Sequence, residues 1–114
     1  RTAQAEAEGN TLTGSPVSAG TVEGVVRVVF DPHQTQLQPG EILVCPGTDP
    51  AWTPLFLAAG GLVMETGGMM THGSVVAREY GIPAVVGVSQ ATTRLQTGQR
   101  IRVDGSSGII TILV

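Results

Sequence analysis

The stretch that decides the fold is GGMMTHGSVVAREYGIPAVVG, residues 67–87. It opens on a glycine pair, continues over 71–80 with small and apolar residues at helical spacing, and stops at Gly81, with Pro83 just beyond. Glycine favours the left-handed conformation that ends helices, and proline cannot continue a helix. The pattern therefore predicts a glycine-rich loop, a helix over 71–80 and a buried strand over 83–88.

His72 lies at the start of this predicted helix. A helix start offers unpaired backbone N–H groups and the positive end of the helix dipole, and both attract phosphate. Gly67 and Gly68 let the backbone approach a ligand closely. A neutral imidazole is a nucleophile that can carry a phosphoryl group, and the hydroxyls of Thr71 and Ser74 could help to hold the added negative charge.

These residues alone leave two interpretations of the histidine. It is a phosphohistidine site, or it is a solvated and hydrogen-bonded residue of the kind that helix starts commonly contain. A metal site is not expected, because the chain has one cysteine, two histidines and no H-x-x-x-H or C-x-x-C spacing. The glycine pair does not fit the Walker or dinucleotide-binding fingerprints either.

Short apolar runs on both sides of this stretch indicate a mixed sheet. Runs of β-branched and apolar residues predict strands at 25–30, 41–45, 61–66, 83–88, 100–103 and 109–114. A second short helix is expected over 50–59, with Asp49 as its N-cap and Gly60-Gly61 at its end. The resulting order, β, β, α, β, α, β, β, β, is typical of a single mixed α/β domain.

The remaining segments are predicted to be connections. Gly20 and Gly24 lie in a stretch dense in turn formers and indicate a bulge or a close approach of two backbones. Residues 31–40 are expected to form a loop. Residues 1–13 are small and polar without an apolar period, which is typical of a linker or frayed end. The domain boundary is placed between a tail at 1–11 and a folded domain at 12–114.

Composition limits the possible functions. The chain has 114 residues, 41% of them hydrophobic, and a formal net charge of −3, which suits one domain with its own core. All six basic residues are arginine and none form a run, so no nucleic acid is expected as a partner. No apolar run approaches the roughly 20 residues of a membrane span, so no membrane is expected either. The single cysteine is consistent with a reducing, cytoplasmic location.

At full length, residues 67–87 resemble the signature of the phosphohistidine, or swivelling, domain of the phosphoenolpyruvate-utilising enzymes. That signature is Gly-Gly, Ser/Thr-His, small residues, Ala-Arg-Glu, Gly-Ile-Pro-Ala and a Val-Gly strand. The likeness extends to GSPVSAGTVEGVVRVV, GEILVCPGTDPAWTPLF and TGQRIRVDGSSGIITIL. The segments TDPAWTPLF and THGSVVAREYGIPAVVGV look most similar to the branch of phosphoenolpyruvate synthase (pyruvate, water dikinase) and rifampicin phosphotransferase.

This resemblance implies an α/β fold: a compact swivelling β/β/α domain with a mixed sheet and two or three short helices. It implies that His72 carries a phosphoryl group from an ATP-grasp-like nucleotide-binding domain to an acceptor-binding domain of the same polypeptide. The acceptor would be pyruvate, an antibiotic hydroxyl or another group. ATP and Mg²⁺ would bind in those partner domains, with no cofactor or metal bound here. Such a domain would not turn over ATP alone.

The resemblance also suggests residues that stabilise the phosphate or orient the histidine. Thr48 lies at a position similar to a family threonine expected to hydrogen-bond the histidine; the alternative role is helix entry. Thr71 is expected to cap the helix and to bond the imidazole or the phosphoryl oxygens. Ser74 is expected to donate to a bound phosphate, unless the position simply tolerates a small residue. Gly68 and Gly73 complete this set.

Arg78 lies six residues beyond His72 and points away from it at 100° per residue. An ion pair to Glu65 or Glu79 is therefore expected for Arg78. Met69 and Met70 are expected to make adaptable apolar contacts or to pack in the ordinary way. Cys45 is expected to be buried and unreactive, and Trp52 to lie in the core or between domains. His33 is expected to be solvated.

Two other functions stay open. The first is a freestanding swivelling module that acts as a scaffold or regulatory partner without phosphorylation. The chain begins with arginine rather than methionine, so a piece of a longer protein is equally compatible with the sequence. The second is a carrier loaded from phosphoenolpyruvate, as in enzyme I of the sugar phosphotransferase system. The sequence flanking this segment in its gene would test the first, and the source of the phosphoryl label would test the second.

Overall fold

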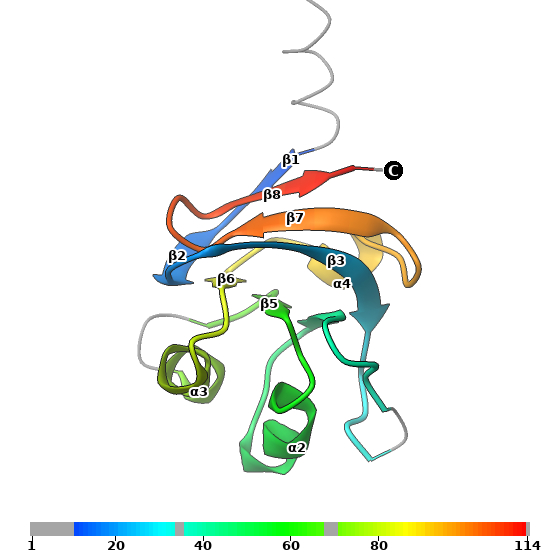
Figure 1. The fold of residues 1–114 in the computed structure, drawn as a ribbon, viewed down its shortest axis with the longest axis vertical. Helices are drawn as coiled ribbons and strands as arrows, with labels where there is room; N and C mark the ends of the chain where they lie inside the picture. Colours follow the sequence, from blue (N-terminus) through cyan, green and yellow to red (C-terminus); the bar gives the residue numbers. More distant parts are fainter. Residues whose placement is uncertain (1–10, 34–35, 68–70, 114) are drawn as a thin grey trace, which may run out of the picture.

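The computed structural model describes residues 11–33, 36–67 and 71–113, which form one mixed sheet with short helices on its faces (Figure 1). The strands are β1 (Thr11–Thr13), β2 (Ser15–Ser18), β3 (Thr21–Val28), β4 (Ile42–Cys45), β5 (Gly61–Met64), β6 (Ala84–Val86), β7 (Arg100–Asp104) and β8 (Ile109–Ile112). The helices are the 3₁₀ turn η1 (Pro50–Trp52), α2 (Thr53–Phe56), α3 (His72–Tyr80) and α4 (Ala91–Arg94). The predicted α/β class, with its mixed sheet and short helices, is confirmed.

The strand order across the sheet is β1-β8-β7-β3-β4-β5-β6-β2. Strands β3, β4, β5 and β6 are parallel neighbours, while the pairings at both ends of the sheet are antiparallel. The two outermost strands, β1 and β2, are joined only by Gly14. The sheet must therefore fold back so that its ends meet, and Gly14 N donates to Gly108 O at 2.9 Å at this junction.

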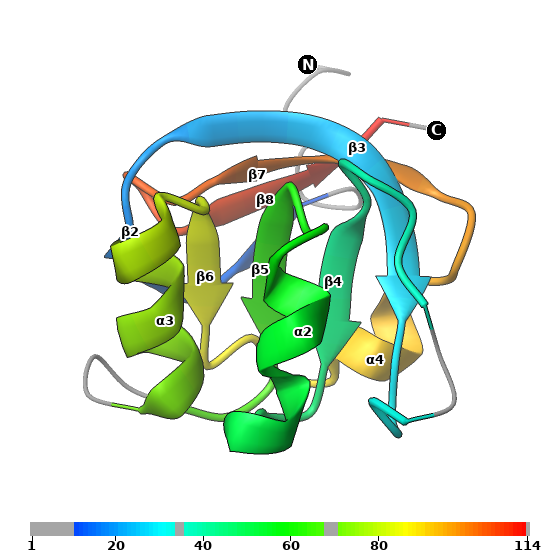
Figure 2. The same cartoon turned by 60° about the horizontal axis from the view of Figure 1, so that its bottom comes forward.

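Apolar side chains cover both faces of the parallel strands, which is why these strands have no alternating pattern. Figure 2 shows α2 and α3 in front of β4, β5 and β6, with β7 and β8 behind. The helical side buries Leu43, Cys45, Leu62, Met64, Ala84 and Val86 against Trp52, Leu55, Phe56 and Ala77. The other side buries Ile42, Val44, Val63 and Val85 against Ala91, Leu95, Ile101, Val103 and Ile110. The sheet is therefore packed between two hydrophobic cores. Each fully buried aliphatic side chain contributes about 1.5–3 kcal/mol to the free energy of folding.

The start of β3 differs from the prediction. The strand begins at Thr21 and ends at Val28, whereas the apolar run predicted 25–30. Its first four residues pair with β7 although three of them are polar or glycine, and Val22 alone makes no strand pattern. The register with β7 is unbroken at Gly24, where an added Cβ would lie 2.7 Å from Gly40 O. A close backbone approach therefore explains this glycine, and a bulge does not.

The linker prediction is wrong at its end. Residues 11–13 form β1, which pairs with β8, and Leu12 is 2% exposed. The other ten residues of the predicted tail lie outside the described part of the chain. A three-residue strand with one apolar side chain has no detectable period. The turn-rich stretch after it likewise hides β2, and α4 is too short to show helical spacing.

The predicted helix over 50–59 is a 3₁₀ turn followed by α2, which ends at Phe56. Asp49 caps it as predicted, since its carboxylate accepts from Ala51 N at 2.9 Å. Pro54 has no N–H to continue the hydrogen-bond ladder from the first turn, so the helical geometry changes there. The predicted glycine end is also displaced, because Gly61 already belongs to β5.

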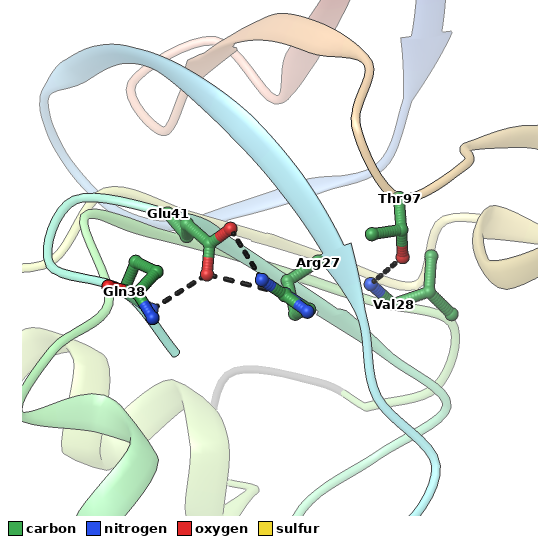
Figure 3. A network of polar contacts seen from close by, with 5 residues as sticks. All are labelled: Arg27, Val28, Gln38, Glu41 and Thr97. Atoms are coloured by element: carbon green, nitrogen blue, oxygen red, sulfur yellow. Dashed lines mark hydrogen bonds and ion pairs between the residues drawn. The ribbon is translucent and has the colours of Figure 1, made fainter. Parts of the chain in front are cut away.

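A polar network closes the edge of the sheet where β4 begins (Figure 3). The Glu41 carboxylate accepts from the Arg27 guanidinium at 3.1 and 3.3 Å and from Gln38 N at 2.7 Å. Toward the other end of these strands, where Val28 of β3 pairs with β4, the Thr97 hydroxyl accepts from Val28 N at 2.9 Å. Since these groups are partly exposed, they fix the register of loop and strand more than they stabilise the fold. Across the residues described, no helix is long and apolar enough to cross a membrane.

Candidate functional site

The candidate site lies at the opposite edge of the sheet, where the parallel strands end. The arrowheads of β4, β5 and β6 point to this edge in Figure 2, and α3 begins beside it. Loops at the carboxyl ends of parallel strands are the usual ligand sites of α/β sheets. The loop after β4 carries Thr48, and the loop after β5 leads to His72, the first residue of α3.

Two contacts hold the His72 imidazole. Its Nδ1 lies 3.1 Å from Thr48 Oγ1, within hydrogen-bonding distance. The ring also packs edge-on against Phe56 of α2, with the centroids 6.2 Å apart and the planes at 69°. The side chain is half-buried. Among the described residues, these contacts engage Nδ1 and one flank of the ring, and neither of them involves Nε2.

Gly73 is required by close packing beneath the histidine. An added Cβ would lie 2.7 Å from both Met64 Sδ and Thr48 Oγ1. Met64, which is 1% exposed, therefore supports the first turn of α3 from below. Gly67 has a φ of 119°, in the region that favours glycine, and its Cβ would lie 3.1 Å from Thr71 Oγ1. Both glycines allow the loop and the helix start to pack closely.

Thr71 occupies the predicted N-cap position of α3, with extended φ and ψ of −73° and 160°. Among the residues described here, no side-chain hydrogen bond joins its hydroxyl to the helix backbone. Its Oγ1 lies 2.9 Å from Ser74 Oγ. Ser74 is completely buried, so its hydroxyl faces the protein and is placed to orient Thr71. Gly68 and the two following methionines, also predicted here, lie outside the described residues.

Two charged side chains near the site, Arg78 and Glu65, make contacts with other elements. The Arg78 guanidinium donates to Val17 O at 3.2 Å, which joins α3 to β2. The Glu65 carboxylate accepts from Thr92 N at 2.8 Å and also from the Thr92 hydroxyl. This second contact joins the exit of β5 to α4, and no sequence signal indicates it, because the two residues are far apart in the chain.

Three other predictions can be compared with the structure. Cys45 is buried, and burial, followed by the nearby charge of Glu65, raises the pKa of its thiol from 9.0 to about 12. Trp52 is a core residue, 6% exposed. His33 is exposed in its loop, as expected. In the described ranges, no group of three or more His, Cys, Asp or Glu side chains could hold a metal ion.

Comparison with known proteins agrees with this geometry. The family described as PEP-utilising enzyme, mobile domain, matches residues 37–108. The chain is 62% identical over 102 residues to a rifampicin phosphotransferase of Streptomyces sviceus, covering 90% of this chain and 12% of that protein. A probable phosphoenolpyruvate synthase of Staphylothermus marinus is 45% identical over 102 residues, covering 87% of this chain and 12% of that protein.

The chain therefore belongs to the mobile, phosphohistidine domain family of the PEP-utilising enzymes. It is homologous to one domain of multidomain phosphotransferases and spans only 12% of the length of these two relatives.

Solved structures show the same fold. An Enzyme I structure determined by NMR has a TM-score of 0.59 and 28% identity, covering 67% of this chain and 32% of that one. Thermococcus kodakaraensis aconitase X has a TM-score of 0.73 at 24% identity, covering 91% of this chain and 98% of that one. The second likeness concerns the fold alone, since the same architecture supports different functions.

Proposed function

We propose that this chain is the phosphoryl-carrier domain of a dikinase-type phosphotransferase, with Nε2 of His72 as the phosphorylated atom. The contact between Thr48 Oγ1 and His72 Nδ1 at 3.1 Å carries this proposal. When Nδ1 keeps its proton and donates it to the threonine, the lone pair of the neutral ring is on Nε2. That nitrogen then acts as the nucleophile without a separate base.

The transfer balances without a redox partner. The Nε2 lone pair attacks phosphorus, and the bond from phosphorus to the donor oxygen breaks, with its electron pair leaving on that oxygen. The product is a phosphoimidazolium in which Nδ1 keeps its proton and its hydrogen bond to Thr48. In the second half-reaction an acceptor hydroxyl oxygen attacks phosphorus and gives its proton to a base of the acceptor-binding domain or to water, while the N–P electron pair returns to Nε2. The N-terminal end of α3 and the Thr71 hydroxyl would stabilise the phosphoryl charge.

The donor and acceptor would bind in other domains of the same polypeptide. The two relatives described above are about eight times longer than the matched segment, which is 12% of their length. One is a phosphotransferase by name and the other a synthase. An ATP-grasp-like domain with Mg²⁺ would load His72, in the cytoplasm. The higher identity to rifampicin phosphotransferases, 62% against 45%, favours an antibiotic hydroxyl over pyruvate as acceptor.

Phosphoramidate, a small phosphoryl donor for histidine, tests the carrier site on the 114-residue chain itself. We expect one added phosphoryl group that is acid-labile and base-stable, detected by mass spectrometry and ³¹P NMR. His72→Ala should abolish it, while His33→Ala, which removes the other histidine, should leave it unchanged. Equal labelling of His72→Ala and the original chain would disprove the proposal.

The natural donor is tested with the full polypeptide encoded by the gene. We expect label from β-³²P-ATP on His72. Label from phosphoenolpyruvate but not from ATP would support the alternative of an Enzyme I-like carrier. A gene that encodes only this domain, with no label from either donor, would support the freestanding module.

A further inference from the structure

The exit of β5 carries a contact that the proposed chemistry does not use. One oxygen of the Glu65 carboxylate, Oε2, accepts both from Thr92 N, at 2.8 Å, and from the Thr92 hydroxyl. Hydrogen bonds to an ionised carboxylate are roughly twice as strong as neutral ones. Thr92 belongs to α4, which is anchored by Ala91 in the apolar cluster on the face opposite α2 and α3. The contact ties the loop before His72 to the far side of the sheet.

Backbone contacts at the same point tie this loop to the one that carries Thr48. Glu65 N donates to Cys45 O at 3.1 Å. The next residue, Thr66, donates to Pro46 O twice, from its N at 3.0 Å and its Oγ1 at 2.7 Å. The exit of β5 thus lies between α4 on one side and the Thr48 loop on the other. A shift at Glu65 would change the position of Thr48 relative to the loop that leads to the histidine.

Two residues next to these anchors have left-handed or glycine-type backbone conformations. Gly67, with its φ of 119°, adopts a conformation that glycine enters and leaves easily. On the α4 side, Gln90 has left-handed φ and ψ of 58° and 32°, a conformation that persists in a non-glycine residue only when its surroundings hold it. The geometry therefore places the anchors at Glu65 and Thr66, and the side chain of Glu65 reaches across the sheet to α4.

We propose that Glu65 is a positioning residue for His72. Its carboxylate, fixed on Thr92, holds the exit of β5 so that the imidazole meets Thr48 through Nδ1 and keeps Nε2 available. The role of Nε2 rests on the proposed carrier function, whereas the orientation of the ring does not. The prediction is that Glu65 controls the tautomer of a ring that it does not touch.

The ring tautomer is measured by ¹⁵N NMR of the imidazole in the 114-residue chain, and the rate by phosphorylation with phosphoramidate. We expect a single Nδ1–H tautomer in the original chain and a mixture in Glu65→Ala, with a rate lower by about tenfold to a hundredfold. Glu65→Gln should keep most of the Nδ1–H tautomer and most of the phosphorylation rate, because its amide oxygen can still accept from Thr92. Glu23→Ala, which removes a carboxylate from an exposed ion pair with Arg102, is the matched control.

A double-mutant cycle separates positioning from a general loss of structure. Glu65→Ala combined with Thr48→Val should be no slower than Thr48→Val alone, because both changes act through one hydrogen bond. Additive losses, or an unchanged tautomer in folded Glu65→Ala, would overturn the proposal. If Glu65→Ala does not fold, Thr92→Val replaces it, since that variant loses the hydroxyl but keeps the N–H; a tautomer unchanged in it would likewise count against the role of Glu65.

The two proposals fail in different ways. If the original chain is not phosphorylated but its tautomer still depends on Glu65, the carrier function is wrong and the positioning role stands. If His72 is phosphorylated at the same rate with and without the Glu65 carboxylate, the carrier function stands and the positioning role is wrong.

Discussion

Individual residues at the site edge show how burial sets chemical reactivity. His72 and Cys45 both lie near the carboxyl ends of the parallel strands, yet only the histidine is partly accessible. The Cys45 thiol faces the helical core, where a thiolate would lose its hydration, so the neutral form is favoured. Of these two residues, His72 is therefore the accessible one and Cys45 is held as a neutral, buried thiol.

The raised pKa of Cys45 predicts a loss of stability at high pH. Above the ordinary value of 9.0 the unfolded chain releases the thiol proton, while the folded chain keeps it up to about 12. The unfolded state then binds fewer protons, so the free energy of unfolding falls as pH rises through this window. Urea unfolding of the original chain between these pH values should show this decline, and Cys45→Ala should show a shallower one. Parallel curves would contradict the assigned pKa.

At the level of elements, the start of α3 is fixed by its fit on β5. Met64 supports Gly73 from the strand below, and Gly81 ends the helix with φ and ψ of 70° and 28°. The two positions require glycine for different reasons. A side chain at Gly73 would meet Met64 and Thr48, whereas Gly81 has no atom within 4 Å of an added Cβ and is required only by its backbone conformation.

Gly73→Ala should therefore affect both stability and the site. The extra methyl group must displace Met64 or Thr48, at a cost of about 1–3 kcal/mol for an overpacked position. We expect slower phosphorylation by phosphoramidate, because Thr48 moves away from the imidazole. Gly81→Ala is the matched control: it should lose about 1 kcal/mol through its backbone conformation and leave the phosphorylation rate of the folded chain unchanged. Equal effects of both variants on the rate would contradict the steric explanation.

At the scale of the whole molecule, the hairpin of β7 and β8 closes the folded sheet. Gly105 lies in its turn, where Gly105 N donates to Gly20 O at 2.7 Å. An added Cβ there would lie 1.9 Å from Ser18 O and 2.8 Å from Ala84 N, so the hairpin turn packs directly on the backbone of β2 and β6. Strands from the beginning, middle and end of the chain meet at this one residue.

Gly105→Ala should destabilise the domain more than a glycine substitution in an open turn. Backbone atoms cannot move aside as a side chain can, so the cost should reach about 3 kcal/mol or more. Gly98→Ala, at a positive φ of 100° with no atom within 4 Å of its Cβ, should cost about 1 kcal/mol. Thermal and urea unfolding measure both. Similar losses in the two variants would show that the junction relaxes.

The sequence by itself determined the α/β class, the strands β4, β5 and β6 as continuous apolar runs, and both ends of α3. Each of these follows from local chemistry: apolar runs form buried strands, and a glycine after a helical pattern ends it. Thr48 was named through the family resemblance, and its contact with His72 emerged only with the fold.

The tertiary structure decided what local patterns cannot encode. Strands β1 and β2 are held by pairing with β8 and β6, and not by a pattern of their own. The Glu65–Thr92 contact spans 27 residues and both faces of the sheet. In each case the interaction joins residues distant in sequence, so only the folded chain brings the two groups together.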